Sequence, residues 1–433
     1  MTPSGWRRML LHEVCSFRRG LTWRKEQEAA GPSGDTLPVL RIPNVQERLV
    51  PNDLLHLRGI EPVAAAKAKV GGGWTVMVGS NGNPKRVGNC VLLKDNQEFV
   101  FASFLLAVGT SDPSQVAPEF LFRLLRSERV QTTIAEQVQG STGLKNINLP
   151  ALKSLPVAIP PLPEQRKIVA ILSSVDEEIE ATQAVIDQLQ VVKKAIMAEL
   201  LMRGLPRRHS TFIESEIGII PQGWTTATYA ELAAPVHAAI QSGPFGSALR
   251  HSEFVAGGRL VVGIDNVLDG RFSLGSNHRI TREKFEELRR FQARPLDLLI
   301  TVMATIGRCC VVPANVEPCI ITKHVYRLSV DPSKADPFFL MHCLYGIERL
   351  AAEVRGSAQG LSRPGLNKSL LLPLRFPLPP LAEQREIVAV LRSLDERFVD
   401  EVEALSAMRL LKAALMNALL SGEVRVGPGQ EAA

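Results

Sequence analysis

The chain has 433 residues, of which 45% are hydrophobic, and its 50 Lys and Arg residues exceed its 44 Asp and Glu residues, giving a formal net charge of +6. A chain of this length predicts two to four domains, each able to bury a core of its own. No apolar run reaches the roughly 18 residues that a membrane-spanning helix needs, and the first residues lack the pattern of a secretory signal. We therefore expect a cytoplasmic protein with no membrane partner.

Six cysteines are scattered along the chain without any Cys-x-x-Cys pair. They are Cys15, Cys90, Cys309, Cys310, Cys319 and Cys343. Such spacing is typical neither of a disulfide framework nor of a zinc site, and the histidines also lack metal-ligand spacing. We expect reduced, mostly buried thiols and no metal site.

The first 160 residues predict a domain of mixed α and β structure. Short β-branched runs at 39–45, 74–79 and 99–108 are separated by Gly, Pro, Asn and Asp, which predicts strands. A helix is predicted at 118–125, where a proline opens an apolar helical pattern.

A long helix is predicted next, from the proline-rich stop at 160–163 to Gly204, because proline fits only before or within a first helical turn and glycine commonly ends a helix. Apolar residues recur along it at alternating steps of four and three, with Thr182 and Lys193 as polar exceptions. This stripe consists of Ile168, Leu172, Val175, Ile179, Ile186, Leu189, Ile196 and Leu200.

The second half of the chain predicts the same order of elements. Strands are expected at 260–267, 298–303 and 319–330, a helix at 337–344, and a second long helix from the prolines at 377–380 to Gly422. Its stripe consists of Ile387, Leu391, Leu394, Phe398, Leu405, Met408, Leu415 and Leu419, with Glu401 and Lys412 as interruptions. Each long helix could pack on its own domain, but two matching stripes in one chain favour antiparallel pairing of the two helices.

The sequence also repeats at an offset of about half its length. Residues 160–201 and 379–420 are identical at 18 of 42 positions, and Pro3-Ser4-Gly5-Trp6 returns as Pro221-Gln222-Gly223-Trp224. Two tandem copies of one unit can form a pseudo-two-fold object, which suits a target with two half-sites.

Positive charge lies in the two mixed segments rather than in the long helices. Residues 1–160 hold 19 basic against 13 acidic residues and residues 207–379 hold 20 against 15, whereas residues 161–206 and 380–425 are each net acidic. An excess of this size is compatible with simple solubility, and its separation from the helices favours binding of nucleic acid by the mixed segments.

One motif opens both long helices. Pro160-Pro161-Leu162-Pro163-Glu164-Gln165-Arg166-Lys167-Ile168-Val169-Ala170-Ile171-Leu172 returns as Pro379-Pro380-Leu381-Ala382-Glu383-Gln384-Arg385-Glu386-Ile387-Val388-Ala389-Val390-Leu391. This duplicated pattern, each copy after a segment that starts near Pro-x-Gly-Trp, resembles the specificity subunit of type I restriction-modification systems over nearly the whole chain.

The resemblance implies an α+β protein with two α/β target-recognition domains, separated by two long antiparallel coiled-coil helices in a pseudo-two-fold internal repeat. The implied domains are target-recognition domain 1 at 1–155, the central conserved spacer helix at 156–210, target-recognition domain 2 at 211–374, and the distal conserved spacer helix with the C-terminal tail at 375–433.

The resemblance also implies partners and chemistry. The chain would read a bipartite, asymmetric sequence in double-stranded DNA and dock two methyltransferase subunits, to which restriction subunits with translocase and endonuclease activity are added. S-adenosylmethionine, ATP and Mg are expected in those partner subunits, and no cofactor is expected in this chain. Family members carry no catalytic centre.

The residues themselves offer no enzyme site. No Asn/Asp-Pro-Pro-aromatic tetrapeptide, G-x-G-x-x-G fingerprint or complete phosphate loop occurs, which counts against a stand-alone nuclease or methyltransferase. A non-catalytic coiled-coil adaptor, or the specificity subunit of a related methylation-based defence system, remains an alternative.

Base readout needs hydrogen-bonding side chains on loops that reach the grooves of DNA. The DNA-binding candidates are Ser80, Asn81, Asn83, Lys85, Arg86, Ser141, Thr142, Lys145 and Asn146 in the first domain, and Thr305, Arg308, Lys323, His324, Ser357, Gln359, Ser362 and Arg363 in the second. The candidates for methyltransferase docking are Glu164, Gln165, Arg166, Glu383, Gln384 and Arg385.

Overall fold

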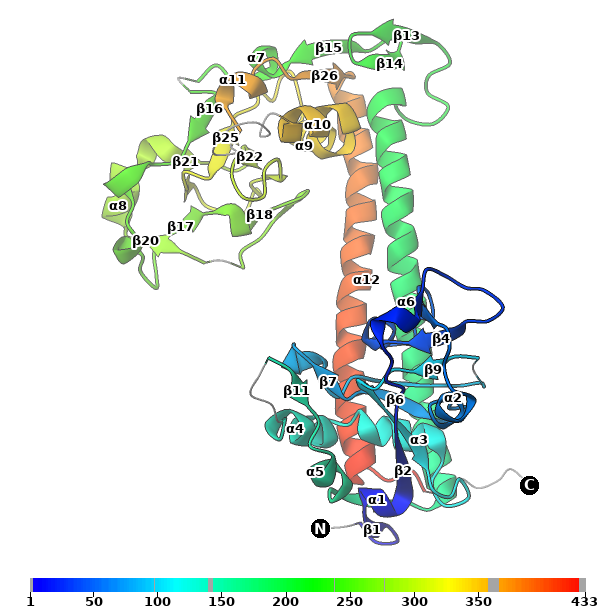
Figure 1. Cartoon of the computed structure of the whole chain (residues 1–433). Helices are drawn as coiled ribbons and strands as arrows, with labels where there is room; N and C mark the ends of the chain where they lie inside the picture. Colours follow the sequence, from blue (N-terminus) through cyan, green and yellow to red (C-terminus); the bar gives the residue numbers. More distant parts are fainter. Residues whose placement is uncertain are drawn as a thin grey trace, which may run out of the picture. The chain divides into compact units, whose positions relative to one another are not determined.

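The computed structural model describes residues 3–96, 98–138, 143–236, 238–275, 277–356 and 366–427. The chain divides into two compact units, unit 1 being Met1–Gln183 with Glu403–Ala433 and unit 2 being Ala184–Val402. Each unit combines a mixed α/β domain with segments of two long helices, α6 (Leu162–Arg203) and α12 (Leu381–Ser421) (Figure 1).

The mixed domain of unit 1 is built on two four-stranded sheets and two separate pairs of strands, β1-β12 and β7-β11. Its strands are β1 (Arg7–Leu10), β2 (Cys15–Arg19), β3 (Glu28–Ala29), β4 (Leu37–Leu40), β5 (Leu55–Leu57), β6 (Thr75–Val78), β7 (Ser80–Asn81), β8 (Cys90–Leu92), β9 (Val100–Phe101), β10 (Leu105–Thr110), β11 (Lys145–Asn146) and β12 (Pro156–Ile159). Its helices are α1 (Leu11–Val14), α2 (Pro62–Lys67), α3 (Pro118–Leu125), α4 (Glu128–Glu136) and α5 (Leu149–Lys153).

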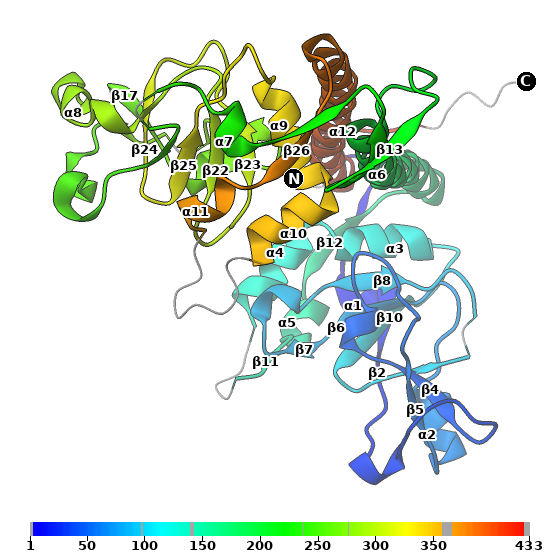
Figure 2. The same cartoon turned by 90° about the horizontal axis from the view of Figure 1, so that it is seen from above.

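The antiparallel sheet β2-β10-β6-β8 is the centre of unit 1. Helix α3 packs beside β8 and buries Phe120 and Leu121 against the sheet (Figure 2). The sheet β3-β5-β4-β9 includes the parallel pair β4 and β9, and β1 pairs with β12 where the chain enters α6.

The mixed domain of unit 2 has the same strand order in its central sheet and a different order in its second sheet. Its strands are β13 (Phe212–Ser215), β14 (Gly218–Pro221), β15 (Thr225–Thr228), β16 (Ile240–Ser242), β17 (Arg259–Val262), β18 (Val267–Leu268), β19 (Arg271–Phe272), β20 (Arg279–Ile280), β21 (Gln292–Ala293), β22 (Leu298–Thr301), β23 (Cys309–Val311), β24 (Cys319–Ile321), β25 (Val325–Leu328) and β26 (Arg375–Leu378). Its helices are α7 (Tyr229–Leu232), α8 (Arg282–Glu287), α9 (Pro337–Gly346), α10 (Glu348–Gly356) and α11 (Lys368–Leu371).

The sheet β16-β25-β22-β23 corresponds to β2-β10-β6-β8, and the pair β15-β26 corresponds to β1-β12. The sheet β20-β17-β24-β21 again contains one parallel pair, β17 with β24. The antiparallel hairpin β13-β14 that precedes β15 has no counterpart among the described residues of unit 1, and the pair β18-β19 is matched there only by an isolated bridge between Val45 and Leu49.

Four predicted strands are wrong in part. Residues 39–45 and 260–267 leave the strand after Leu40 and Val262 and form a short 3-10 helix, and residues 99–108 and 319–330 each form two short strands instead of one. A tight turn separates β9 from β10, with the Leu105 amide donating to the Ala102 carbonyl at 2.9 Å, and the Val325 amide donates to Thr322 in the same way at 3.0 Å. The backbone of another segment crosses at each turn, where only glycine fits: a Cβ on Gly20 would lie 2.2 Å from the Ala102 oxygen. Each turn sends its two strands into different sheets.

The long helices α6 and α12 begin and end where the sequence predicts. Each ends at a glycine in the left-handed region, Gly204 (φ +78°) and Gly422 (φ +76°). Every residue of the two predicted apolar stripes is buried or half-buried.

Polar interruptions of the stripes meet a partner on the other helix. In unit 1 the Lys412 ammonium lies 2.6 Å from the Asp176 carboxylate, and in unit 2 Lys193 pairs with Asp395. Within unit 1 Thr182 faces Met408, so the residue number in α12 falls as that in α6 rises, and the two helices run in opposite directions there.

By length and composition alone, α12 could cross a membrane. One such helix is weak support for a membrane span, because core helices of soluble proteins pass the same test. Asp395 and Lys412 of α12 form ion pairs with α6, which is the behaviour of one member of a helix pair.

All six cysteines are buried free thiols, as the sequence predicts. Burial raises the pKa of Cys15, Cys90 and Cys319 to about 12. Such thiols stay protonated and unreactive at neutral pH.

Candidate nucleic-acid interface

The candidates of unit 1 gather at one end of the β2-β10-β6-β8 sheet. The chain leaves β6 and forms β7, which pairs with β11 so that Asn81 lies opposite Lys145 and Ser80 opposite Asn146. Two neighbourhoods more than 60 residues apart in the sequence thus form one two-stranded ribbon. We call residues 79–86, 103–104 and 145–147 the loop end of unit 1.

Asparagine side chains shape the loop after β7. The Asn81 side-chain oxygen accepts a hydrogen bond from the Asn83 amide at 2.7 Å, and the Asn83 oxygen accepts one from the Lys85 amide at 3.1 Å. Asparagine commonly forms such turns. Both amide groups keep their nitrogen donors for another partner, and Lys85 is exposed.

Arg86 differs from Lys85 because its guanidinium is used within the domain. It donates to the carbonyls of Ile42 and Val45, at 3.3 and 3.4 Å, in the short turn that follows β4. Arg86 therefore holds the loop end against the second sheet. Ser80 is buried, while Asn83 and Asn146 are exposed; Ser141 and Thr142 lie outside the described residues.

The candidates of unit 2 gather at the corresponding end of the β16-β25-β22-β23 sheet. The Val302 amide, just after β22, donates to the His324 carbonyl at 2.9 Å, which joins the loop of Thr305 and Arg308 to the turn of Lys323 and His324. We call residues 302–308, 322–324 and 366 the loop end of unit 2.

Charge at the loop end of unit 2 comes from two exposed side chains, Arg308 and Lys323. Partial burial and the neighbouring Lys323 lower the pKa of His324, which favours its neutral form, with one nitrogen donating and one accepting. The Thr305 hydroxyl is buried, so Arg308 is the polar side chain of this loop that reaches solvent, beside the apolar Met303, which is 38% exposed.

The loop that precedes each long helix meets the same place in both units. The Ile147 amide donates to the Gly79 carbonyl at 2.9 Å, and the Leu366 amide donates to Val302 at 3.0 Å. The candidates Ser357, Gln359, Ser362 and Arg363 lie outside the described residues, immediately before Leu366.

Sequence reasoning missed Phe104 and Arg19. Phe104 is 46% exposed at the tip of the turn between β9 and β10, where its carbonyl accepts from the Ser80 amide at 3.1 Å. It holds the place that His324 holds in unit 2, since the Leu105 and Val325 amides close equivalent turns. Arg19 ends β2 at the same end of the sheet and is exposed. An alignment of residues 102–105 with residues 322–325 would have placed Phe104 opposite the candidate His324.

The Glu-Gln-Arg motif has mostly internal partners. In unit 1 Glu164 is buried and accepts hydrogen bonds from Trp6 Nε1 at 3.0 Å and from Arg425 at 2.8 and 3.0 Å. Gln165 is fully buried and bonds the backbone of Gln115, Ala117 and Pro160. These side chains fasten the domain to the start of α6.

Unit 2 repeats this arrangement with one exchange. Glu383 accepts from Trp224 Nε1 at 3.2 Å, but its second partner is His209, at 2.6 Å, in place of an arginine. Gln384 is fully buried and bonds the backbone of Asp336 and Pro379. Among the six docking candidates only Arg166 and Arg385 are exposed. Methyltransferase docking stays a prediction, and these two side chains are the ones available for it.

Within the described ranges, no three His, Cys, Asp or Glu side chains come together in a group able to hold a metal ion. The chemistry of both loop ends is that of hydrogen-bonding and cationic side chains. Such groups bind phosphates and base edges.

The family model described as the type I restriction modification DNA specificity domain matches residues 3–191 and 273–405. The chain belongs to this family. The resemblance drawn from the duplicated motif is therefore confirmed, and the chain is classed with the specificity subunits of type I restriction-modification systems.

Relatives with this assignment align with most of this chain. The putative type I restriction enzyme MjaX specificity subunit of Methanocaldococcus jannaschii is 25% identical over 98% of this chain and 95% of its own length. The MjaVIII specificity subunit of the same organism is 27% identical over 71% of this chain and 70% of its own length. The StySPI specificity subunit of Salmonella potsdam is 22% identical, with 98% and 90% covered.

Two solved structures share the fold. A chain from work on complex assembly and conformational transition of the type I R-M system aligns with a TM-score of 0.60 at 19% identity, covering 98% of this chain and 100% of that one. The S subunit of the type I system of M. genitalium aligns with a TM-score of 0.57 at 14% identity, covering 96% of both chains.

Proposed function

We propose that each unit reads one half of a bipartite, asymmetric DNA sequence through its loop end. The observation that carries this proposal is that equivalent ends of the two central sheets both gather polar and cationic loop residues from three separate segments. Two different sets of side chains on one framework would read two different half-sites.

The side chains available at each loop end fit different parts of DNA. Exposed cations such as Lys85, Arg19 and Lys323 would bind phosphates, and amide groups such as Asn83 and Asn146 would bind adenine edges in the major groove. Arg308 would suit a guanine. Which bases are read depends on these few side chains.

The long helices would form an antiparallel coiled-coil spacer that relates the two readers by a pseudo-two-fold axis. Support comes from the paired interruptions, Asp176 with Lys412 and Lys193 with Asp395, which fix the register of α6 against α12 in both units. A fixed register suits a spacer that sets the gap between half-sites.

The outer surface of the helix pair would dock two methyltransferase subunits, to which restriction subunits are added. Arg166 and Arg385 are exposed at the two helix starts, and Val191, Leu410 and Leu411 are 65%, 72% and 54% exposed on the helices. Large apolar side chains that face solvent on a helix are common at protein interfaces. Methylation with S-adenosylmethionine and DNA cleavage with ATP and Mg would belong to those subunits, in the cytoplasm, and this chain would carry out neither reaction.

An exchange of readers tests the proposal. Residues 213–365 are replaced by the equivalent segment of a relative, the chain is assembled with its methyltransferase subunits, and methylated adenines are mapped in cellular DNA. We expect one half of the target to change and the other to stay. A change in both halves would contradict separate readers, and methyl transfer by the purified chain alone would contradict a non-catalytic subunit.

A further inference from the structure

Unit 1 contains a groove that no residue of its loop end lines. It lies between α4, the β1-β12 pair and the end of α12, and has a volume of about 780 Å³. Apolar side chains form much of its wall: Leu124, Val130, Leu155, Met416 and Leu420. Arg8 and Arg129 line its rim and are exposed.

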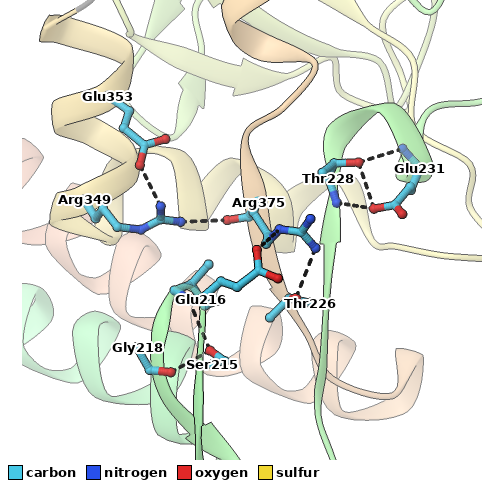
Figure 3. Close-up of polar contacts among 10 residues, drawn as sticks. Ser215, Glu216, Gly218, Thr226, Thr228, Glu231, Arg349, Glu353 and Arg375 are labelled. Atoms are coloured by element: carbon cyan, nitrogen blue, oxygen red, sulfur yellow. Dashed lines mark hydrogen bonds and ion pairs between the residues drawn. The ribbon is translucent and has the colours of Figure 1, made fainter.

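The counterpart of this groove in unit 2 is occupied by the chain itself. The hairpin β13-β14 places Ile217, which is 7% exposed, in the apolar cluster that includes Met197 and Leu201 of α6. Beside it, the Glu216 carboxylate lies 2.9 Å from Nε of Arg375 on β26 (Figure 3). The hairpin turn is closed by Ser215, whose hydroxyl donates to the Gly218 carbonyl at 2.6 Å.

The two places correspond residue by residue. Pro156 of unit 1 corresponds to Arg375 of unit 2, because each is the first residue of the strand that precedes a long helix and each pairs with the last residue of its partner strand. The repeat sets Ser421 where Met202 stands, and Met202 is the side chain nearest to Gly218 of the hairpin. Pro156 and Ser421 both line the groove. Among the described residues of unit 1, no strand pair corresponds to β13-β14, and Pro3, the counterpart of Pro221 at the end of β14, lines the groove.

Both strand pairs contain an arginine, but on different strands: Arg375 lies on β26 in unit 2, and Arg8 lies on β1 in unit 1. In unit 2 Arg375 of β26 donates to Thr226 of β15 and meets Glu216. In unit 1 the counterpart of Arg375 is a proline, and the counterpart of Thr226 is Arg8. The acidic Glu128 of the groove is already bonded to Asn417, and Glu423 is its other acidic residue.

We propose that the groove of unit 1 binds a turn of a partner polypeptide in which an acidic residue precedes a branched apolar residue and a glycine, the chemistry of Glu216-Ile217-Gly218. The apolar side chain would enter the groove as Ile217 does in unit 2, and the acidic one would meet Arg8. A second copy of this chain is disfavoured as the occupant, because its own hairpin is committed to unit 2 through Ile217. This inference concerns a protein partner and does not depend on DNA reading.

A peptide with the sequence of residues 211–222 is the probe, and its binding to the full chain is followed by fluorescence anisotropy. We expect saturable binding that Arg8→Glu weakens about fivefold, since an ion pair becomes a repulsion. A peptide with lysine at the Glu216 position should bind the Arg8→Glu chain better than the original peptide does. An Ile-to-Asp change in the peptide should abolish binding. Absence of saturable binding, or binding indifferent to Arg8→Glu, would overturn the proposal.

A graft provides a second measurement on the full chain. Residues 212–220 are placed directly before Pro3, so that they can fill the groove as β13-β14 does in unit 2. We expect the melting temperature to rise by about 2–4 °C and the free peptide to bind no longer; a graft with Asp in place of Ile is the control. Two results would overturn the proposal of a partner polypeptide. Peptide binding that appears only after deletion of residues 428–433 would assign the groove to the chain's own C-terminal residues. A dimer, detected by light scattering and dissociated by the peptide, would assign it to a second copy of the chain.

Discussion

The carboxylate of Asp176 on α6 accepts a hydrogen bond from Lys412 on α12, at 2.6 Å, and another from Arg123 on α3. One acidic side chain thus joins the helix pair of unit 1 to its mixed domain. Burial alone would raise the pKa of Asp176, but the hydrogen bonds from Lys412 and Arg123 hold it below its ordinary value of 3.8.

Unit 2 has different partners around the equivalent aspartate, Asp395. Asp395 pairs with Lys193, and the place of Arg123 is taken by His342, whose ring nitrogen lies 2.6 Å from the Tyr345 hydroxyl. Burial, with Lys193 and Arg392 nearby, lowers the pKa of His342 to about 3, so this histidine is neutral. At the place where Arg123 forms an ion pair with the long helix in unit 1, unit 2 therefore has a neutral histidine that bonds a tyrosine of its own helix, α9.

Replacing Asp176 should destabilise unit 1. In Asp176→Asn the cations of Lys412 and Arg123 lose their shared counter-charge, and we expect a loss of about 1–3 kcal/mol, moderate because the carboxylate is partly exposed. Urea unfolding measures it, with Glu177→Gln, an exposed acidic residue of the same helix, as the control. Equal stability of the two variants would show that the link contributes nothing.

Glu164 should make the stability of unit 1 depend on pH. Its pKa lies below the ordinary 4.5, chiefly because Arg425 donates hydrogen bonds to it, with a further bond from Trp6. A carboxyl whose pKa is lower in the folded chain stabilises the fold above its unfolded pKa, and this contribution is lost as pH falls through the folded pKa.

We therefore expect Glu164→Gln to melt at a lower temperature than the parent chain at neutral pH, and the difference to shrink as pH falls below about 4.5. Melting curves across pH measure this, with Glu180→Gln, exposed on the same helix, as the control. A constant difference over the whole range would contradict the assignment.

Lys85 should bind a DNA phosphate. Each phosphate contact contributes about 0.9 to the slope of log affinity against log salt, so Lys85→Ala should flatten that slope by about this amount. Lys94 is the matched control, because it is exposed beyond the opposite end of the same sheet. Arg86→Ala is expected to destabilise the loop end instead, since its guanidinium bonds the backbone of Ile42 and Val45. An unchanged slope in Lys85→Ala would remove this residue from the interface.

Phe104 should contribute to base recognition through apolar contact, for instance with a thymine methyl group. We expect Phe104→Ala to weaken specific binding by roughly 1–2 kcal/mol, about tenfold, without changing the salt slope. Competition between target and random DNA measures the effect. The control Val63→Ala truncates a side chain that is 67% exposed on α2, away from the loop end. If both variants keep the specificity of the parent, Phe104 does not touch bases.

The helix pair should set the gap between half-sites. Four residues inserted after Thr182 in α6, together with four inserted before Met408 in α12, lengthen the pair by about 6 Å. Both insertions are needed, since the Thr182 hydroxyl faces Met408 Sδ at 3.8 Å and a single insertion would break the register of the ion pairs. We expect the same half-sites one or two base pairs further apart, mapped by methylated adenines; an insertion in α6 alone is the control. Methylation at the original gap would show that the helices do not set it.

Much of the framework could be predicted from the sequence because its signals are local. Proline entries, the spacing of the apolar stripes and the terminal glycines define α6 and α12, and the repeat places equivalent elements in both halves. The loop end was predicted as separate neighbourhoods. Asn81 and Lys145 have no sequence pattern that joins them, and only strand pairing brings them together.

By itself, then, the sequence determined the family, the long helices, the order of the mixed domains and the residue types available for reading DNA, because each follows from periodicity, composition or a repeated motif. Only the tertiary structure decided which of these side chains are free to act. Glu164 and Gln165 look like a surface motif, yet they are buried and bonded within unit 1, while Phe104, apolar and unremarked in its strand, is exposed at a turn. The reason is physical: exposure and hydrogen-bond partners are set by segments distant in the chain, such as the close approach of Gly20 to Ala102, where the turn that contains Phe104 begins.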